Sequence, residues 1–202
     1  MKKIIFFATF FGYALFAQAQ SDKLATAFIA SYGYEAKADY SSAIKTIKEV
    51  YDEKSYEINL RLGWLHYEAG LFTESQAYYE KAIQLMPYAI EAKLGSVYPA
   101  SALGNWDKVT TQYNKILEID PQNTTVNYRL GNIYYGKKDY ASAYKYFQKV
   151  VNLYPFGYDA LLMYAWTNLQ IGKTGEAKVL FNKVLLTSPN DKSALEGLSM
   201  IK

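Results

Sequence analysis

Four of the five prolines in this chain of 202 residues recur at a fixed interval. Pro87, Pro121, Pro155 and Pro189 each follow the previous one by 34 residues, and only Pro99 stands outside the series. A fixed period of this length is typical of repeat proteins, whose units bury their apolar faces only against their neighbours. Because proline cannot donate to a helical hydrogen bond, each member of the series is expected to close one repeat. The chain is therefore predicted to fold as a stack of repeats.

Other residue types fall into columns when each repeat is counted so that its proline occupies position 32. The four repeats then start at Tyr56, Ile90, Thr124 and Tyr158. Position 24 is always aromatic, and it reads Tyr79, Tyr113, Phe147 and Phe181. Position 15, where a turn between two helices is expected, reads Gly70, Gly104, Lys138 and Gly172. These columns predict two helices in every repeat, joined by a tight turn.

The columns, together with Leu62-Gly63 and Leu130-Gly131, resemble the tetratricopeptide repeat family. The resemblance covers nearly all of the chain that follows its first 19 residues. It implies an all-α fold, a right-handed helix–turn–helix solenoid. A diverged copy starting near Leu24 and a final helix over 192–202 bring the expected total to about five repeats with a C-terminal capping helix. The shared residues are packing and turn residues, so they indicate the fold more than the function.

The first 19 residues have the composition of an export signal. A basic pair at residues 2–3 precedes an apolar run over residues 4–16, and residues 17–19 offer the small-x-small pattern at which signal peptidase cuts. We expect cleavage after Ala19 and a periplasmic or secreted domain over residues 20–202. An uncleaved anchor is the alternative, but the apolar segment is shorter than the roughly 20 residues that a bilayer span needs.

The charge and cysteine content restrict the partners. The chain has 22 basic and 19 acidic residues, and loss of the two N-terminal lysines brings it close to neutrality without any basic run. Nucleic acid is therefore not an expected partner, and no membrane span is expected after cleavage. Because cysteine is absent, stability must come from packing, and a lipid-anchored type of signal is excluded.

No residue pattern points to catalysis. The chain lacks a metal-ligand cluster, a phosphate-binding glycine loop and a nucleophile elbow. His66, the single histidine, falls in a column where Tyr34 and Tyr134 stand in other repeats, so we interpret it as a partly buried packing residue. The chain is predicted not to be an enzyme and to need no cofactor or metal.

In the family, the first helices of the repeats line a concave groove, which positions 2, 5, 9, 12 and 13 face. Many of these positions carry aromatic residues here, and aromatic side chains make good anchors for a partner because they bury a large area with few rotamers. The predicted partner-binding residues are Phe28, Tyr32, Leu60, Trp64, Tyr67, Tyr98, Tyr128, Arg129, Asn132, Tyr135 and Trp166. The alternative is that the chain uses its 21 tyrosines freely and that these side chains pack on one another.

Some members of the family hold the C-terminal carboxylate of a partner with lysine, arginine and asparagine side chains. Asn132, Arg61 and Arg129 are present here, but positions 2, 5 and 13 carry no matching set of lysines. The resemblance therefore does not extend to that clamp. A protein or peptide segment with apolar or proline side chains is the expected ligand, and Arg129 could orient an acidic group.

Pro99 is expected inside the first helix of the third repeat, where proline costs about 3 kcal/mol in an ordinary helix interior. Leu94-Gly95 resembles the signature of positions 7 and 8 but arrives two residues early. We therefore expect this helix to start near Tyr88 and to kink between Gly95 and Pro99. The kink is either a tolerated defect or a device that brings Tyr98 toward a ligand.

The sequence as a whole predicts an exported, non-enzymatic binding protein that acts as an adaptor or scaffold in the cell envelope. The alternative is a structural subunit of a larger envelope assembly, associating through its convex face or its helical ends. The residue pattern does not distinguish the two, and it leaves the oligomeric state and the partner open.

Overall fold

The computed structural model describes residues 22–201, and every regular element among them is an α-helix. The predicted export signal over residues 1–19 lies outside this range. The chain divides into two compact units, one ending at Gln112 and the other beginning at Tyr113. We describe each unit by itself.

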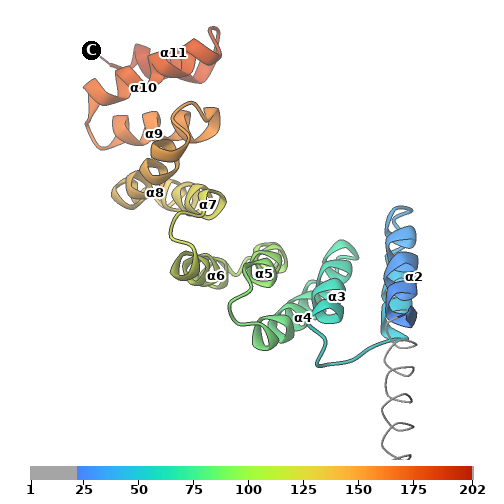
Figure 1. The fold of residues 1–202 in the computed structure, drawn as a ribbon. Helices are drawn as coiled ribbons and strands as arrows, with labels where there is room; N and C mark the ends of the chain where they lie inside the picture. Colours follow the sequence, from blue (N-terminus) through green and yellow to red (C-terminus); the bar gives the residue numbers. More distant parts are fainter. Residues whose placement is uncertain (1–21, 202) are drawn as a thin grey trace, which may run out of the picture. The chain divides into compact units, whose positions relative to one another are not determined.

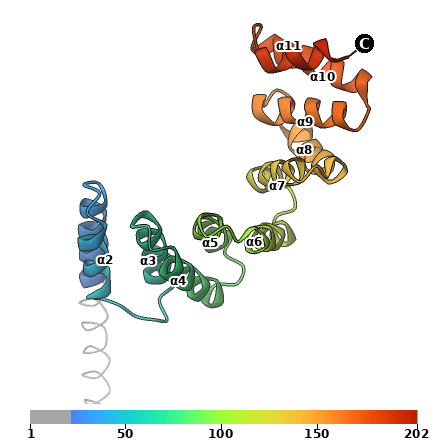
Figure 2. The same ribbon diagram turned by 180° about the vertical axis from the view of Figure 1, so that it is seen from behind.

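Unit 1 consists of paired antiparallel helices, which lie side by side within each pair in both views (Figures 1 and 2). A helix over residues 22–35 pairs with α2 (Tyr40–Lys48), and α3 (Tyr56–Glu68) pairs with α4 (Phe72–Leu85). These are followed by α5 (Ile90–Ala102), and the division between the units falls within α6 (Trp106–Ile119).

Unit 2 continues the same alternation of helices. Its elements are α7 (Thr124–Gly136), α8 (Tyr140–Leu153), α9 (Tyr158–Gln170), α10 (Thr174–Thr187) and α11 (Lys192–Ser199). The helices α9, α10 and α11 pack on one another at the C-terminal end (Figure 1). Across residues 22–201 the fold is therefore a helical solenoid of tetratricopeptide-like repeats. None of these helices is both long enough and apolar enough to cross a bilayer.

The turn inside each repeat is made by a residue with positive φ. Gly70, Gly104 and Gly172 have φ values of 75°, 71° and 80°, and Lys138 adopts the same conformation at 61°. Glycine is favoured there because it has no Cβ to clash in the left-handed region. The position 15 column therefore marks the turn, as the sequence predicts, even where lysine replaces glycine.

The turn between repeats is held by the fourth residue of the following helix. Asn59 Nδ2 donates to the carbonyl of Ser55 at 2.7 Å, and Asn127 Nδ2 donates to the carbonyl of Pro121 at 3.1 Å. Lys93 Nζ contacts the carbonyls of Pro87 and Ala89 in the same way. Asn59 Nδ2 also donates to the carbonyl of Glu53 at 3.0 Å, so in each of these repeats the side chain satisfies a carbonyl of the preceding turn.

This arrangement corrects one expectation about the third repeat. The helix α5 begins at Ile90, not near Tyr88, because Ala89 is extended (φ −69°, ψ 121°) and Tyr88 belongs to the turn that Lys93 holds. Pro99 lies inside α5, which is assigned as one helix through Ala102. The kink between Gly95 and Pro99 stays a prediction.

Gly95 has a different role from the one that its sequence context suggests. It is the sixth residue of α5, and a Cβ placed there would overlap the ring of Tyr79 from the preceding repeat. Gly63, the eighth residue of α3, approaches the same ring from within its own repeat, since a Cβ there would lie 2.9 Å from Cγ of Tyr79. The sixth residue of α11, Gly197, faces Phe181 as Gly95 faces Tyr79. Glycines on two different helices, Gly63 on α3 and Gly95 on α5, thus leave room for the aromatic ring of position 24.

Each unit has its own apolar core. At the N-terminal end of unit 1, aliphatic side chains of the first three helices form a core. These side chains are Ala27, Ala43, Ile44, Ile47, Ile58, Leu62 and Leu65. The core of unit 2 is centred on Phe147 and Phe181, both fully buried. Burial of an aromatic or aliphatic side chain of this size contributes about 1.5–3 kcal/mol.

Candidate partner-binding groove

An open groove with a volume of about 1030 Å³ lies within unit 1, and we call it the unit 1 groove. It is lined mainly by the helix over residues 22–35, α3 and α5, the first helices of three successive repeats. Position 5 supplies Phe28, Leu60 and Leu94, and position 9 supplies Tyr32, Trp64 and Tyr98. Residues four apart share one face of a helix, so these two columns form a continuous apolar strip.

Several residues of the strip remain available for contact. Tyr32 is 55% exposed and Tyr98 is 50% exposed, whereas Phe28, Leu60 and Trp64 are half-buried. An apolar surface that is hollow, aromatic and accessible is what a partner's apolar side chain needs for burial.

Tyr67, also predicted as a groove residue, supports the strip without lining the groove. Its ring centroid lies 5.8 Å from that of Trp64 and 5.4 Å from that of Tyr98. Trp64 and Tyr98 in turn meet edge to face at 6.2 Å. The aromatic residues therefore do pack on one another, and the packing fixes Trp64 and Tyr98 at the surface of the groove.

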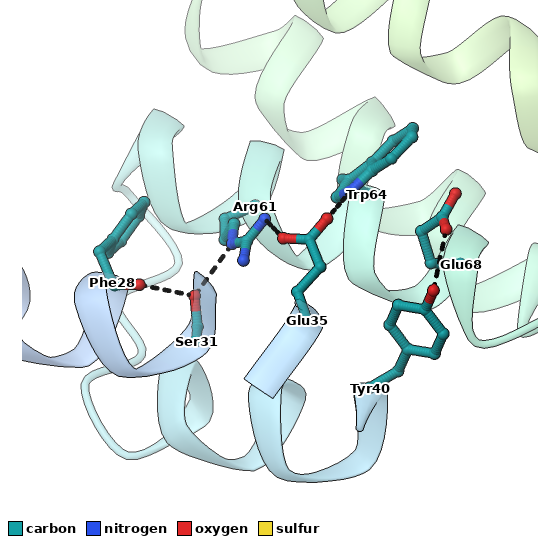
Figure 3. A network of polar contacts seen from close by, with 7 residues as sticks. All are labelled: Phe28, Ser31, Glu35, Tyr40, Arg61, Trp64 and Glu68. Atoms are coloured by element: carbon teal, nitrogen blue, oxygen red, sulfur yellow. Dashed lines mark hydrogen bonds and ion pairs between the residues drawn. The ribbon is translucent and has the colours of Figure 1, made fainter. Parts of the chain in front are cut away.

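A polar network orients one wall of the groove (Figure 3). Arg61 forms an ion pair with Glu35, with 2.6 Å between Nη1 and Oε2, and its Nε donates to Ser31 Oγ at 3.0 Å. The guanidinium carbon lies 3.8 Å from the ring centroid of Tyr32. The other carboxylate oxygen of Glu35 accepts a bond of 2.6 Å from Trp64 Nε1. Two groove aromatics, Tyr32 and Trp64, are thus oriented by the ion pair between the buried Arg61 and the half-buried Glu35.

Because Arg61 is buried, its ion pair with Glu35 matters for stability. Arg61 is only 6% exposed and its Nη2 has no hydrogen-bond partner among residues 22–201, while Glu35 is 24% exposed. Taking a guanidinium out of water is costly unless a carboxylate compensates it. The pair therefore ties the helix over residues 22–35 to α3 and fixes the wall in one arrangement.

Two further carboxylates line the groove at the N-terminal ends of its helices. Glu57 and Glu91 occupy position 2 of α3 and α5, and both are exposed. Glu57 accepts from Ser55 Oγ at 3.0 Å, and Glu91 accepts from the hydroxyl of Tyr56 at 3.2 Å. Burial of Tyr56, together with the negative charge of Glu91, raises the pKa of this tyrosine to about 12. The tyrosine therefore stays a neutral donor at any ordinary pH.

The remaining predicted groove residues belong to unit 2, where the structure gives most of them packing partners. The Tyr128 ring lies 6.0 Å from that of Phe147, and Tyr135 lies 5.2 Å from Tyr140. Asn132 Nδ2 donates to the carbonyl of Tyr128 at 3.1 Å.

Trp166 and Arg129 differ in their surroundings. The ring of Trp166 meets that of Phe181 edge to face at 5.2 Å, and its Nε1 donates to Ser193 Oγ at 2.9 Å. Trp166 therefore helps to hold α11 in place. Arg129 is exposed on α7.

Sequence reasoning missed the polar residues of the unit 1 groove. Glu57 and Glu91 stand at position 2 and Glu35 at position 12, both among the positions that face the groove in the family. The family's groove-facing positions include these three glutamates, but a prediction based on aromatic residues at those positions does not. The partnership of Arg61 with Glu35 joins residues 26 apart in sequence, and no local pattern predicts it.

His66 is a packing residue. It is 2% exposed, its Nδ1 lies 2.7 Å from the carbonyl oxygen of Leu62, and its ring centroid lies 4.8 Å from that of Tyr78. Burial lowers the pKa of His66 because the charged form is poorly solvated there. Among residues 22–201, no three acidic or histidine side chains gather so that they could hold a metal ion.

Comparison with known proteins agrees with this architecture. Residues 56–87, 125–156 and 159–191 each match a family described as "Tetratricopeptide repeat". The chain is 25% identical over 169 residues to the TPR repeat-containing protein YpiA of Bacillus subtilis. This alignment covers 82% of the chain and 40% of that protein. It is 23% identical to anaphase-promoting complex subunit 7 of Arabidopsis thaliana over 73% of the chain and 28% of that protein. The chain thus spans less than half the length of these relatives.

Solved structures share the fold. A tetratricopeptide repeat protein from Parabacteroides merdae superposes with a TM-score of 0.74 at 22% identity, covering 89% of this chain and 72% of that one. The MamA protein superposes with a TM-score of 0.70 at 18% identity, covering 82% of this chain and 91% of that one. The repeat matches and these neighbours together support a protein of the tetratricopeptide repeat type.

Proposed function

We propose that this tetratricopeptide repeat protein is an adaptor of the cell envelope that binds a segment of a partner protein in the unit 1 groove. Proteins built of these repeats generally mediate protein–protein interactions. The observation that carries the proposal is the accessible strip of Phe28, Tyr32, Leu60, Trp64, Leu94 and Tyr98.

The geometry of the strip explains how it would bind. Tyr32 and Trp64 are held in place by the Arg61–Glu35 pair, and Tyr98 by its contacts with Trp64 and Tyr67. Side chains that are already ordered lose little entropy when a partner arrives, so more of the burial energy appears as affinity. Apolar side chains of an extended or helical segment would be buried against this surface.

The envelope location is supported by the composition of residues 2–19, with a basic start, an apolar run and a small-residue cleavage site. Cell fractionation followed by N-terminal sequencing tests it. The mature protein is expected in the periplasm or the medium and should begin at Gln20. Recovery of a chain with its first 19 residues intact would argue against cleavage.

Binding is tested with a random 15-residue peptide library displayed on phage and selected on the purified protein. The affinities of the selected peptides are then measured for the wild type and for Leu60→Ala and Trp64→Ala. We expect each substitution to weaken binding by about tenfold or more, since central apolar contacts usually dominate an interface. Far-ultraviolet circular dichroism shows whether each variant keeps its helical content.

Leu60→Ala is the more informative variant, because Trp64 also donates to Glu35 whereas Leu60 has no polar partner to lose. Unchanged affinity in a folded Leu60→Ala protein would show that the selected peptides bind elsewhere.

A second candidate function is that of a structural subunit in a larger assembly. It is favoured by apolar side chains exposed near the turns between repeats, such as Tyr88 at 82% and Leu186 at 74%. One relative is named as a subunit of a complex, the anaphase-promoting complex. Size-exclusion chromatography with light scattering distinguishes the two: a mass that rises with protein concentration favours the subunit, and a constant monomer mass favours the adaptor.

A further inference from the structure

The charges around the unit 1 groove specify the partner more closely than its apolar strip does. Three carboxylates, Glu35, Glu57 and Glu91, and one guanidinium, Arg61, line the groove. Glu35 is neutralised by Arg61 at 2.6 Å. The other two carboxylates have no ion pair within residues 22–201 and accept only from neutral hydroxyl groups, those of Ser55 and Tyr56. The accessible part of the groove therefore carries an excess of negative charge.

From this charge distribution we infer that the partner segment is basic as well as apolar, with a lysine or arginine side chain seated between Glu57 and Glu91. The inference rests on the proposed function, since it describes the ligand of the same groove. Complementary charge fixes the register of a partner and excludes segments of the wrong sign. An acidic segment would meet two uncompensated carboxylates and be repelled.

The apolar lining suits the stem of such a side chain. Leu60 and Leu94 lie at position 5, one helical turn beyond Glu57 and Glu91 at position 2 on the same helices. Lysine and arginine bury their methylene stems along apolar surface while the charged group stays at a polar rim. The adjacent apolar side chains of the segment then lie over Phe28, Trp64 and Tyr98.

An acidic ligand for Arg61 is the opposite possibility, because its Nη2 lacks a partner in the part of the chain that the structure describes. The structure disfavours it for two reasons. Arg61 is 6% exposed and covered by the ring of Tyr32, and its charge is already balanced by Glu35. A second carboxylate would have to displace that ring and lie next to Glu35, with a cost in repulsion.

The experiment starts from the selected 15-residue peptides, whose composition is read first. Enrichment of lysine or arginine beside leucine or aromatic residues is expected. For one selected peptide, the basic residues are replaced by glutamine and, in a second version, by glutamate. Fluorescence anisotropy then gives the dissociation constants of the three peptides at low and high salt.

The matching protein variant is Glu57→Gln/Glu91→Gln, with Glu74→Gln/Glu176→Gln as its control. All four glutamates are exposed and lie in the first turn of a helix, so both variants lose the same favourable interaction with the helix dipole. Only Glu57 and Glu91 line the groove. The groove variant should weaken binding of the basic peptide by about three- to tenfold, and the control variant should change it by less than about twofold.

The outcomes separate this inference from the proposed function. Binding that depends on Leu60 but favours the glutamate peptide, or that the groove variant leaves unchanged, overturns the basic partner and keeps the groove. Selection of acidic peptides or of free C-terminal carboxylates that need Arg61 would show the opposite ligand. Peptides whose affinity does not depend on Leu60 would overturn the groove itself, and the basic partner with it.

Discussion

Gly95 faces the ring of Tyr79 so closely that no Cβ atom fits between them. Tyr79 is 2% exposed and comes from the preceding repeat, so this contact joins α4 to α5. Gly63 approaches the same ring from α3, where a Cβ would lie 2.9 Å from Cγ of Tyr79. The contact is a point where successive repeats depend on one another.

Gly95→Ala is therefore expected to destabilise the protein by about 1–3 kcal/mol, although alanine is normally the better helix residue. Urea denaturation followed by circular dichroism measures the change. Gly33→Ala serves as the control, since a Cβ there meets nothing within 4 Å and the residue is helical. That variant should be stabilised by roughly 0.5–1 kcal/mol. A neutral or stabilising Gly95→Ala would mean that Tyr79 has room to shift.

Gly95 also shows what sequence could and could not predict. The proline series and the columns predict the helices well, because caps, turns and small residues act locally. The helices α3, α5, α7 and α9 begin at the residues counted as position 1. In the sequence, Gly95 resembles a displaced copy of Gly63, since both follow leucine, and the expected start near Tyr88 depends on that equivalence. Its true partner, Tyr79, belongs to another repeat, and only the folded chain brings the two together.

The unit 1 groove likewise has features that the sequence predicts and features that it does not. Its apolar residues follow from the position rule of the family, and Phe28, Tyr32, Leu60, Trp64 and Tyr98 do line one groove. The ion pair that orients them depends on the distance between two helices, which no residue pattern contains. The sequence therefore predicts which faces meet but not how charges pair across them.

The Arg61–Glu35 pair predicts an asymmetry between two substitutions. Glu35→Gln leaves a buried guanidinium without its carboxylate, and we expect a loss of about 2–4 kcal/mol. Arg61→Met removes the buried charge and keeps an apolar stem, so its cost should be smaller. Thermal or urea unfolding of both variants and of the double variant measures this difference. A larger loss for Arg61→Met would mean that the packing of Arg61 against Tyr32 outweighs its charge.

His66 predicts a pH dependence of stability. Burial lowers the pKa of His66 below its usual value near 6.5, so in this range the unfolded state binds a proton more readily than the folded state. The free energy of unfolding should thus fall as pH drops from 7 to 5.5, by up to about 1 kcal/mol.

His66→Tyr is the control for that measurement, because tyrosine occupies this column in other repeats and does not titrate there. As His66 is the single histidine of the chain, the variant should lose most of the slope. A slope that persists in His66→Tyr would assign the effect to carboxylates.

Pro99 predicts a gain in stability on substitution. Pro99→Ala restores an N–H donor within α5, where proline in a helix interior costs about 3 kcal/mol. Part of this gain is offset because the buried proline ring loses its contacts, so we expect a net increase of about 1–2 kcal/mol in urea denaturation. If peptide affinity is unchanged in this variant, Pro99 does not shape the groove; a loss of stability would mean that the ring's packing outweighs the missing hydrogen bond.

The central claim is that partner segments bind the aromatic strip of the unit 1 groove, and a pair of tyrosines tests it most directly. Tyr98 is 50% exposed and lines the groove, whereas Tyr88 is 82% exposed, lies in the turn before the same helix and does not line it. The measurement is the dissociation constant of a selected peptide for Tyr98→Ala and for Tyr88→Ala. We predict a loss of about tenfold or more for Tyr98→Ala and less than about twofold for Tyr88→Ala. Equal losses, or a larger loss for Tyr88→Ala, would contradict the account.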